Sequence, residues 1–227
     1  MTVILVRHGR STANTAGLLA GRTPGVFLDD HGTAQARELA TRLDGVLDRL
    51  TAVVRSPLER CGQTVEPLLA ATAGRDTGAV PEVVVDDLVE VDYGDWSNRG
   101  LGDLVNEPLW KTVQTTPSQA VFPGGEGLAD VSRRATAAVR ALDRVHGGDD
   151  GAHPWVLCSH GDVLKAILAD ALGMALDDFQ RIVVAPASIS VVQYAPQTVV
   201  HTVNNAGAVT LPARPAQATA VGGSTGT

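Results

Sequence analysis

Val3-Ile4-Leu5-Val6-Arg7-His8-Gly9-Arg10, near the start of the chain, is the stretch that decides the fold. Its four β-favouring apolar residues predict a short strand buried on both faces, as in parallel sheets. Open α/β sheets bind ligands outside the C-terminal ends of their strands. We therefore expect this strand to deliver a cation, an imidazole and a flexible backbone into a crevice. Taken alone, a solvated strand end with a turn glycine explains the triplet equally well.

The bulk composition is that of an ordinary globular protein. Of 227 residues, 44% are hydrophobic and 19% charged, which suits one large domain or two small ones. The net charge of −7 argues against nucleic-acid or membrane partners, so an anion site must be a local basic cluster. No signal sequence or bilayer-length apolar run is evident, and we expect a cytoplasmic protein. Cys61 and Cys158 lack metal-ligand spacing and are expected to be reduced and buried.

Strand and helix patterns alternate along the chain. Helices are expected from Asp29 or Asp30 onward, from Pro57 onward, and over 131–145 and 162–172. This alternation predicts an α/β three-layer sandwich, a mostly parallel sheet with helices on both faces. Predicted strands cover 3–6, 51–56, 82–85, 155–159, 189–194 and 199–203.

Two segments depart from the alternating pattern, and no second-domain boundary is evident. Residues 97–125 are irregular and interrupted by proline and glycine, and we interpret them as an excursion from the core that could form a lid. Residues 212–227 hold too few apolar side chains to become ordered. The sequence thus predicts one domain over 1–211 and a disordered tail.

Three predicted strand ends carry similar residues. They are Arg7-His8-Gly9, Arg55-Ser56 with Arg60 beyond it, and Ser159-His160-Gly161. In a parallel sheet these ends share one edge, and the helix that follows Gly161 would point its free N–H groups there. Two histidines, several arginines and a helix N-terminus make an anion site, and phosphate matches arginine forks best.

These segments resemble the histidine phosphatase superfamily, the group that includes the cofactor-dependent phosphoglycerate mutases. The triplet at the first strand is weakly diagnostic by itself. Its combination with the later segments, each after a predicted strand, is specific. The matching residues, in the family's order, are Leu5-Val6-Arg7-His8-Gly9 with Ser11, Thr12 and Asn14; Ser56-Pro57-Leu58 with Arg60, Gln63 and Thr64; Glu90 with Gly94 and Trp96; Gly124-Gly125-Glu126; and Ser159-His160-Gly161-Asp162.

The resemblance implies a role for each matched residue. His8 would be the nucleophile that forms a phosphohistidine, which requires a neutral imidazole with a fixed tautomer. Arg7 and Arg60 would clamp the phosphate, His160 would be the second pocket histidine, and Asn14 would add a neutral donor. No metal or other cofactor is implied.

The proton donor is implied to be Glu90, which would protonate the leaving oxygen and then activate water. Asp92 is a rival two residues away, and strand-like alternation would place both carboxylates on the same side. Spacing alone therefore does not choose between them, and we prefer Glu90 because it matches the family position.

Several charged residues have simpler interpretations. Asp162 is expected to cap a helix, and Glu126 to belong to the first turn of one. Arg10 stands where the family usually has an acidic or amide residue. It is either a solvated side chain or, together with Arg22, a site for a second anionic group of the substrate.

Three functions are compatible with this sequence. Mutases of this family carry a longer basic insertion, whereas residues 97–125 hold only Arg99 and Lys111 as cations. We therefore favour a phosphatase on small phosphate monoesters, with a phosphomutase as the alternative. An inactive phospho-ligand-binding module is disfavoured, because the candidate nucleophile and proton donor are both present. A homodimer through a sheet edge or the excursion is compatible with the sequence, which does not define the substrate.

Overall fold

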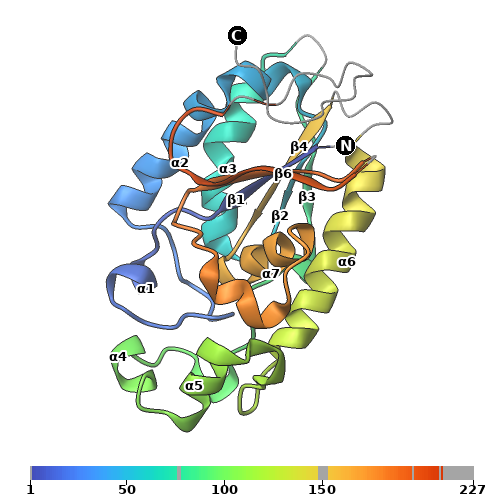
Figure 1. Ribbon diagram of the computed structural model, residues 1–227. Helices are drawn as coiled ribbons and strands as arrows, with labels where there is room; N and C mark the ends of the chain where they lie inside the picture. Colours follow the sequence, from blue (N-terminus) through green and yellow to red (C-terminus); the bar gives the residue numbers. More distant parts are fainter. Residues whose placement is uncertain (1, 76–77, 148–152, 196, 210, 212–227) are drawn as a thin grey trace.

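The computed structural model describes residues 2–75, 78–147, 153–195, 197–209 and 211. At its centre is one six-stranded sheet in the order β3-β2-β4-β1-β5-β6 (Figure 1). Strands β1 to β4 run parallel, whereas β5 is antiparallel to β1, and β6 to β5. The strands are β1 (Thr2–Arg7), β2 (Val53–Arg55), β3 (Glu82–Val84), β4 (Pro154–Ser159), β5 (Ile189–Gln193) and β6 (Val199–Asn205).

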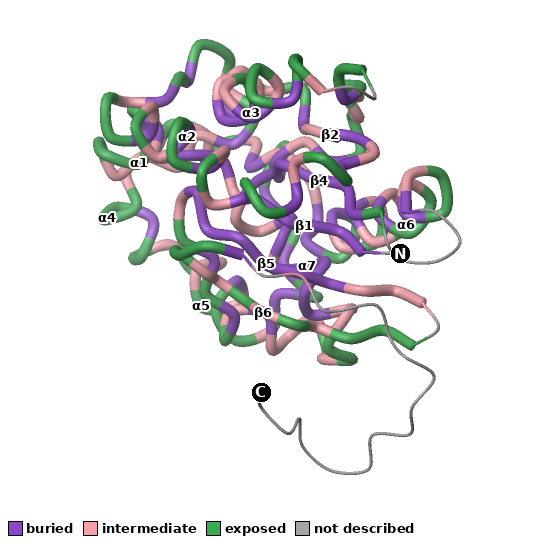
Figure 2. The backbone as a smooth tube through the Cα atoms, turned by 90° about the horizontal axis from the view of Figure 1, so that it is seen from above, coloured by how far each residue is buried: buried purple, intermediate pink, exposed green. Residues whose placement is uncertain are grey.

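Strand β1 is buried on both faces, as its unbroken apolar run predicts. Val3 and Leu5 pack into one hydrophobic cluster, whereas Ile4 and Val6 pack into another on the opposite face. The alternation follows from the period of two along a strand. Figure 2 shows the result as buried strands in the middle of the molecule, with exposed segments on the outside.

Helices cover both faces of the sheet. Helices α2 (Asp30–Arg42) and α3 (Glu59–Thr72) bury Leu39 and Leu68 against one face. Helices α6 (Leu128–His146) and α7 (Gly161–Ala171) bury Val139 and Ile167 against the other. The predicted α/β sandwich with a mostly parallel sheet is confirmed, while the predicted tail, residues 212–227, lies outside the described residues.

Two helix boundaries differ from those expected. Helix α2 ends at Arg42, and a 3-10 helix, η1 (Asp44–Arg49), carries the rest of the apolar stripe with Val46 still buried. Helix α3 begins at Glu59 rather than at Pro57, because Leu58 adopts an extended conformation with φ −70° and ψ 142°. Side-chain periodicity reports which face is buried, and both stripes remain buried in these altered conformations.

The excursion lies beyond the C-terminal ends of the parallel strands (Figure 1). It is anchored to the core, since Leu104, Val113 and Phe122 are buried in the same cluster as Leu5. Among the described residues, no helix combines the length and apolarity needed to span a bilayer. Besides η1, the short elements between β1 and β5 are α1 (Thr12–Thr15), η2 (Asp86–Leu88), η3 (Gly94–Trp96), α4 (Leu101–Leu104), α5 (Pro108–Thr115), η4 (Pro117–Gln119) and η5 (Leu176–Arg181).

Candidate active site

The register of the sheet brings the two histidines together. Arg7 of β1 pairs with Ser159 of β4, and the His8 amide donates to the Ser159 carbonyl at 3.0 Å. The next residue on each strand is a histidine, so the imidazoles of His8 and His160 lie with ring centroids 5.2 Å apart. The parallel pairing of β1 with β4 thus positions two side chains that are 152 residues apart in the sequence.

The surroundings of His8 fix a neutral tautomer. Its Nδ1 lies 2.7 Å from the Gly9 carbonyl oxygen, which can only accept, so Nδ1 carries the proton. Its Nε2 accepts from Nε of Arg60 at 3.3 Å. Burial, followed by the charges of Arg60 and Arg7, holds the pKa of His8 well below its ordinary value. Nε2 is therefore unprotonated at neutral pH, and its lone pair is engaged only by the long contact with Arg60.

Three buried nitrogens near this imidazole have no intramolecular partner, although both arginines are held in place through their other nitrogens. Arg60 Nη2 donates to the Gly21 carbonyl at 2.9 Å, and Arg7 Nη1 to the Val184 carbonyl at 2.6 Å. Within the described part of the chain, Arg7 Nε, Arg60 Nη1 and His160 Nδ1 are buried with no partner. Because unsatisfied buried donors are rare and costly, these nitrogens indicate a site for an anion.

The second histidine contacts Ser56 and Cys61 through one ring nitrogen. Nε2 of His160 lies 2.7 Å from the Ser56 hydroxyl oxygen and 3.6 Å from the Cys61 sulfur. A hydroxyl that donates to Nε2 would leave the His160 proton on Nδ1, the unpartnered nitrogen. His160 is also the N-cap residue of α7, and Gly161 begins that helix and lines the cavity. The helix N-terminus adds a partial positive charge there.

Glu90, not Asp92, lies in the cavity. The Glu90 side chain is 8% exposed, and its Oε1 accepts from the Val91 amide at 3.0 Å. Burial, reinforced by the nearby Asp162 carboxylate, raises the pKa of Glu90 to about 7. Asp92 instead accepts from the Gly94 amide at 3.0 Å and does not line the cavity. Residues 90–93 belong to no strand, so the strand-like alternation does not hold.

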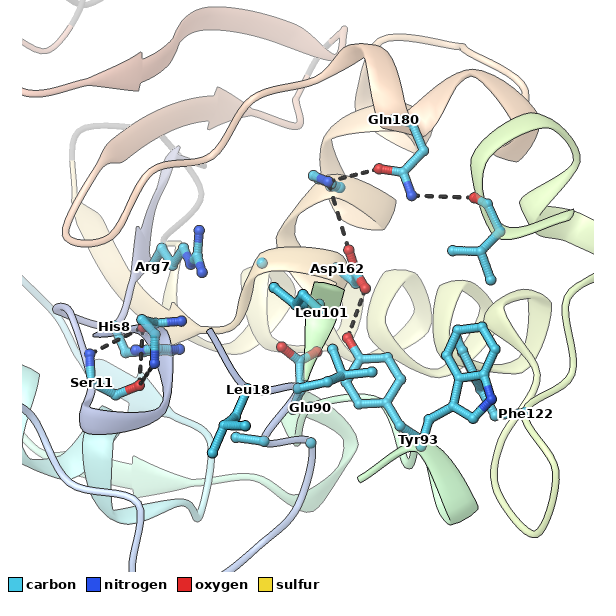
Figure 3. A pocket seen from close by; sticks show the side chains of 18 of the residues that line it. Arg7, His8, Ser11, Leu18, Glu90, Tyr93, Leu101, Phe122, Asp162 and Gln180 are labelled. Atoms are coloured by element: carbon cyan, nitrogen blue, oxygen red, sulfur yellow. Dashed lines mark hydrogen bonds and ion pairs between the residues drawn. The ribbon is translucent and has the colours of Figure 1, made fainter. Parts of the chain in front are cut away.

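The cavity has a volume of about 310 Å³ and extends well beyond His8 (Figure 3), whereas His160 is fully buried behind the lining. Its walls come from the 18–21 loop, the excursion, and helices α7 and η5. The excursion's apolar side chains were a signal for this wall, but the contributions of Lys165 and Gln180 carried no sequence signal that we identified. The lining residues that the sequence did not single out as ligands include Leu18, Tyr93, Leu101, Trp110, Phe122, Asp162, Lys165 and Gln180.

Two arginines expected near the substrate lie outside this lining. Arg10 Nε pairs with Asp29 Oδ2 at 2.6 Å, and its half-exposed side chain does not line the cavity. Arg22 donates from Nε to the Glu90 carbonyl at 2.9 Å and pairs with Glu126. Asn14 does line the cavity, and its carboxamide oxygen accepts from the Ser11 amide at 3.0 Å. That contact engages the oxygen of the carboxamide and not its amide nitrogen.

Two carboxylates have contacts different from those expected. Asp162 does not cap α7, whose N-cap is His160; its Oδ2 accepts from the Tyr93 hydroxyl at 2.7 Å instead. Glu126 precedes α6, which begins at Leu128, and its carboxylate pairs with Arg134 at 2.7 Å and with Arg22 at 2.9 Å. Asp162 is the second residue of α7 and Glu126 precedes the N-cap Gly127 of α6, so each helix begins at a different residue from the one expected.

The two cysteines and the possible metal ligands lie outside the proposed chemistry. Cys61 and Cys158 are buried free thiols, as expected. In the described ranges, no group of three or more His, Cys, Asp or Glu side chains could hold a metal ion.

The mostly parallel sheet and the anion-binding cavity at its C-terminal edge define an α/β enzyme for phosphate esters. The family model for the histidine phosphatase superfamily (branch 1) matches residues 3–206. The adenosylcobalamin/alpha-ribazole phosphatase of Salmonella typhimurium is 34% identical over 177 residues, which are 77% of this chain and 81% of that protein. The chain belongs to the histidine phosphatase superfamily, and the predicted phosphatase class is confirmed.

Solved structures agree with this assignment. The alpha-ribazole phosphatase from Shigella flexneri superposes with a TM-score of 0.78 at 26% identity, over 93% of this chain and all of that one. A mycobacterial glucosyl-3-phosphoglycerate phosphatase shares the fold with a TM-score of 0.77 at 22% identity, over 89% of this chain and 98% of that one.

Proposed function

We propose that His8 Nε2 attacks the phosphorus of a small phosphate monoester and forms a phosphohistidine. The observation that carries this proposal is the neutral imidazole surrounded by the unpartnered nitrogens of Arg7, Arg60 and His160. These donors would hold the phosphoryl oxygens, with Asn14 and the start of α7 at Gly161 as further donors. Phosphoryl transfer depends chiefly on such positioned charge.

Glu90 would supply the proton in the first step and remove one in the second. Its carboxyl, with a pKa of about 7, is substantially protonated at neutral pH. It would protonate the leaving oxygen as the P–O bond breaks. The resulting carboxylate would then take a proton from the water that attacks the phosphohistidine, which releases phosphate and restores both groups.

Hydrolysis is favoured over intermolecular phosphoryl return by the make-up of the cavity wall. The excursion contributes Leu101, Trp110 and Phe122 to the lining, whereas neither of its cations, Arg99 and Lys111, lines the cavity. A bisphosphorylated intermediate would need a second cluster of cations there. Because several relatives are alpha-ribazole phosphatases, alpha-ribazole phosphate is the first candidate substrate for this chain.

Phosphate release from a panel of metabolite monoesters that includes alpha-ribazole phosphate tests the proposal. We expect turnover with at least one of them, the same rate in EDTA, and loss of activity in His8→Ala. Stopped-flow trapping should show a phosphohistidine that decays to free phosphate. Activity that survives His8→Ala, or that disappears with EDTA, would contradict the mechanism.

The proposal also places the enzyme in the cytoplasm, which the buried thiols Cys61 and Cys158 favour. The proposal also includes a homodimer that forms through a sheet edge, such as β6, or through the excursion. Light scattering of the purified protein measures the oligomeric state directly.

A further inference from the structure

The cavity has a far end that the proposed phosphoryl chemistry does not use. Arg7 and His8 lie on one side of it, and Gln180, Tyr93 and Phe122 lie on the other (Figure 3). Apolar side chains such as Leu101 line the space between. The far side is the place for the group to which the phosphate is attached.

Most polar groups at the far end are already engaged. Gln180 accepts from Lys165 Nζ at 2.9 Å through its Oε1, and its Nε2 donates to the Val113 carbonyl at 3.2 Å. Asp162 accepts from the Tyr93 hydroxyl at 2.7 Å. These contacts hold α7, η5, α5 and the loop of Tyr93 in a fixed arrangement around one ammonium group.

Lys165 keeps unused donors. An ammonium carries three N–H groups, and the contact with Gln180 uses one of them. Lys165 also forms an ion pair with Asp162, but the 3.7 Å from Nζ to Oδ1 is longer than a hydrogen bond, and Nζ lies 5.5 Å from the centroid of the Phe179 ring. Neither contact takes up an N–H donor, and the side chain is 20% exposed. Apart from Arg7 and Arg60, Lys165 is the only arginine or lysine among the described residues that line the cavity.

We propose that Lys165 binds an acceptor oxygen on the leaving group of the substrate, at the end remote from the phosphorus. The substrate class is then a phosphate monoester with an apolar middle and a carboxylate or similar acceptor oxygen beyond it, which differs from alpha-ribazole phosphate, whose remote end is an apolar ring. The apolar middle contacts side chains such as Leu101 and Phe122, and the acceptor satisfies the half-buried ammonium. This inference rests on the proposed function and adds the specificity of the same site.

Benzyl phosphates test the inference, because the methylene insulates the leaving oxygen from ring substituents. The measurement is kcat/KM for benzyl, 3-carboxybenzyl, 4-carboxybenzyl and 4-(trimethylammonio)benzyl phosphate. The wild-type enzyme should have a higher kcat/KM for at least one carboxybenzyl ester than for benzyl phosphate and for the trimethylammonio ester. Lys165→Met, of similar length and shape, should lower kcat/KM for that ester roughly 10-fold or more, the size expected for a hydrogen bond to a charged group. Its loss on benzyl phosphate should be much smaller, so that the ratio of kcat/KM for that carboxybenzyl ester to kcat/KM for benzyl phosphate falls roughly 10-fold.

Lys111→Met is the matched control, because Lys111 is exposed on α5 and does not line the cavity. It should leave all four rates unchanged. Equal losses on every ester in Lys165→Met would mean that the lysine only supports Gln180 and Asp162, and would overturn the inference. If the variant fails to fold, the wild-type preferences decide: no preference for either carboxybenzyl isomer overturns the inference. Failure of the proposed function gives a different result: no ester is then hydrolysed at a rate that depends on His8.

Discussion

At the residue scale, burial shifts two titratable groups of one cavity in opposite directions. Desolvation lowers the pKa of His8 and raises that of Glu90, because in both cases it disfavours the charged form. At neutral pH the imidazole is neutral and the carboxyl substantially protonated. A nucleophile and a proton donor thus occur together in the protonation states that the first step of the proposed mechanism requires.

The pH dependence of the rate follows from the Glu90 carboxyl. We expect kcat/KM to fall as pH rises through about 7, because the proton donor ionises there. Removing the Asp162 charge in Asp162→Asn should lower the pKa of Glu90 and move this fall to lower pH. Asp95→Asn, which changes an exposed carboxylate outside the lining, should leave the profile in place. An unchanged pH profile in Asp162→Asn would show that ionisation of Glu90 does not cause the fall in kcat/KM.

Replacing Glu90 separates activity from stability. Glu90→Gln should lower kcat by about 100-fold to 10,000-fold, the usual range for a lost general acid. The wild-type carboxyl ionises near 4.5 when unfolded and near 7 when folded, so its contribution to stability is lost as pH rises through 7. Each pKa unit corresponds to about 1.4 kcal/mol, so the pH-dependent difference is on the order of 3 kcal/mol.

Thermal melting at pH 5 and pH 8 measures that difference. The Tm of Glu90→Gln relative to wild type should be higher at pH 8 than at pH 5, since glutamine has no charge to bury. A relative Tm that does not change between the two pH values would contradict a buried, raised Glu90 carboxyl.

At the element scale, the loop after β1 lies directly against the first turn of α2. A Cβ on Gly32 would meet the Arg10 carbonyl oxygen at 1.9 Å, and a Cβ on Gly9 would meet the Gly32 oxygen at 2.7 Å. The Asp29 N-cap accepts from the Gly32 amide at 2.7 Å in the same turn. Backbone thus packs on backbone here, which fixes the direction in which the chain leaves His8.

Two helix glycines should respond oppositely to the same change. Gly32→Ala forces a clash with backbone and should lower the free energy of unfolding by roughly 2 kcal/mol or more. Gly62 of α3 has only an ordinary 3.5 Å contact with Arg55, so Gly62→Ala should raise it by about 0.5 to 1 kcal/mol. Urea unfolding measures both values. A neutral Gly32→Ala would argue against the close packing of this loop.

At the scale of the whole molecule, the cavity joins segments that are distant in the sequence. Its lining runs from Arg7 to Gln180 and includes the loop after β1, the excursion and the start of α7. Any anion that bridges these segments binds the folded chain and not the unfolded one. Ligand binding should therefore stabilise the entire fold.

Inorganic phosphate should raise the Tm of the protein. At 100 times its Kd, a ligand specific for the folded state adds about 2.7 kcal/mol, which for a chain of this size corresponds to roughly 5 to 10 °C. Arg60→Ala should abolish the increase, whereas Arg37→Ala, an exposed position on α2, should preserve it. An equal increase in Arg60→Ala, measured by scanning calorimetry, would mean that phosphate binds elsewhere.

The sequence alone determined the sheet, its two helical layers and the edge where the histidines meet. Apolar runs and periodicities report burial within one element, and the C-terminal ends of parallel strands must share an edge. Only the tertiary structure separated Glu90 from Asp92, moved Asp162 from a helix cap to Tyr93, and brought Lys165 to the far end of the cavity. Those outcomes depend on contacts between segments far apart in the chain, which no local pattern encodes.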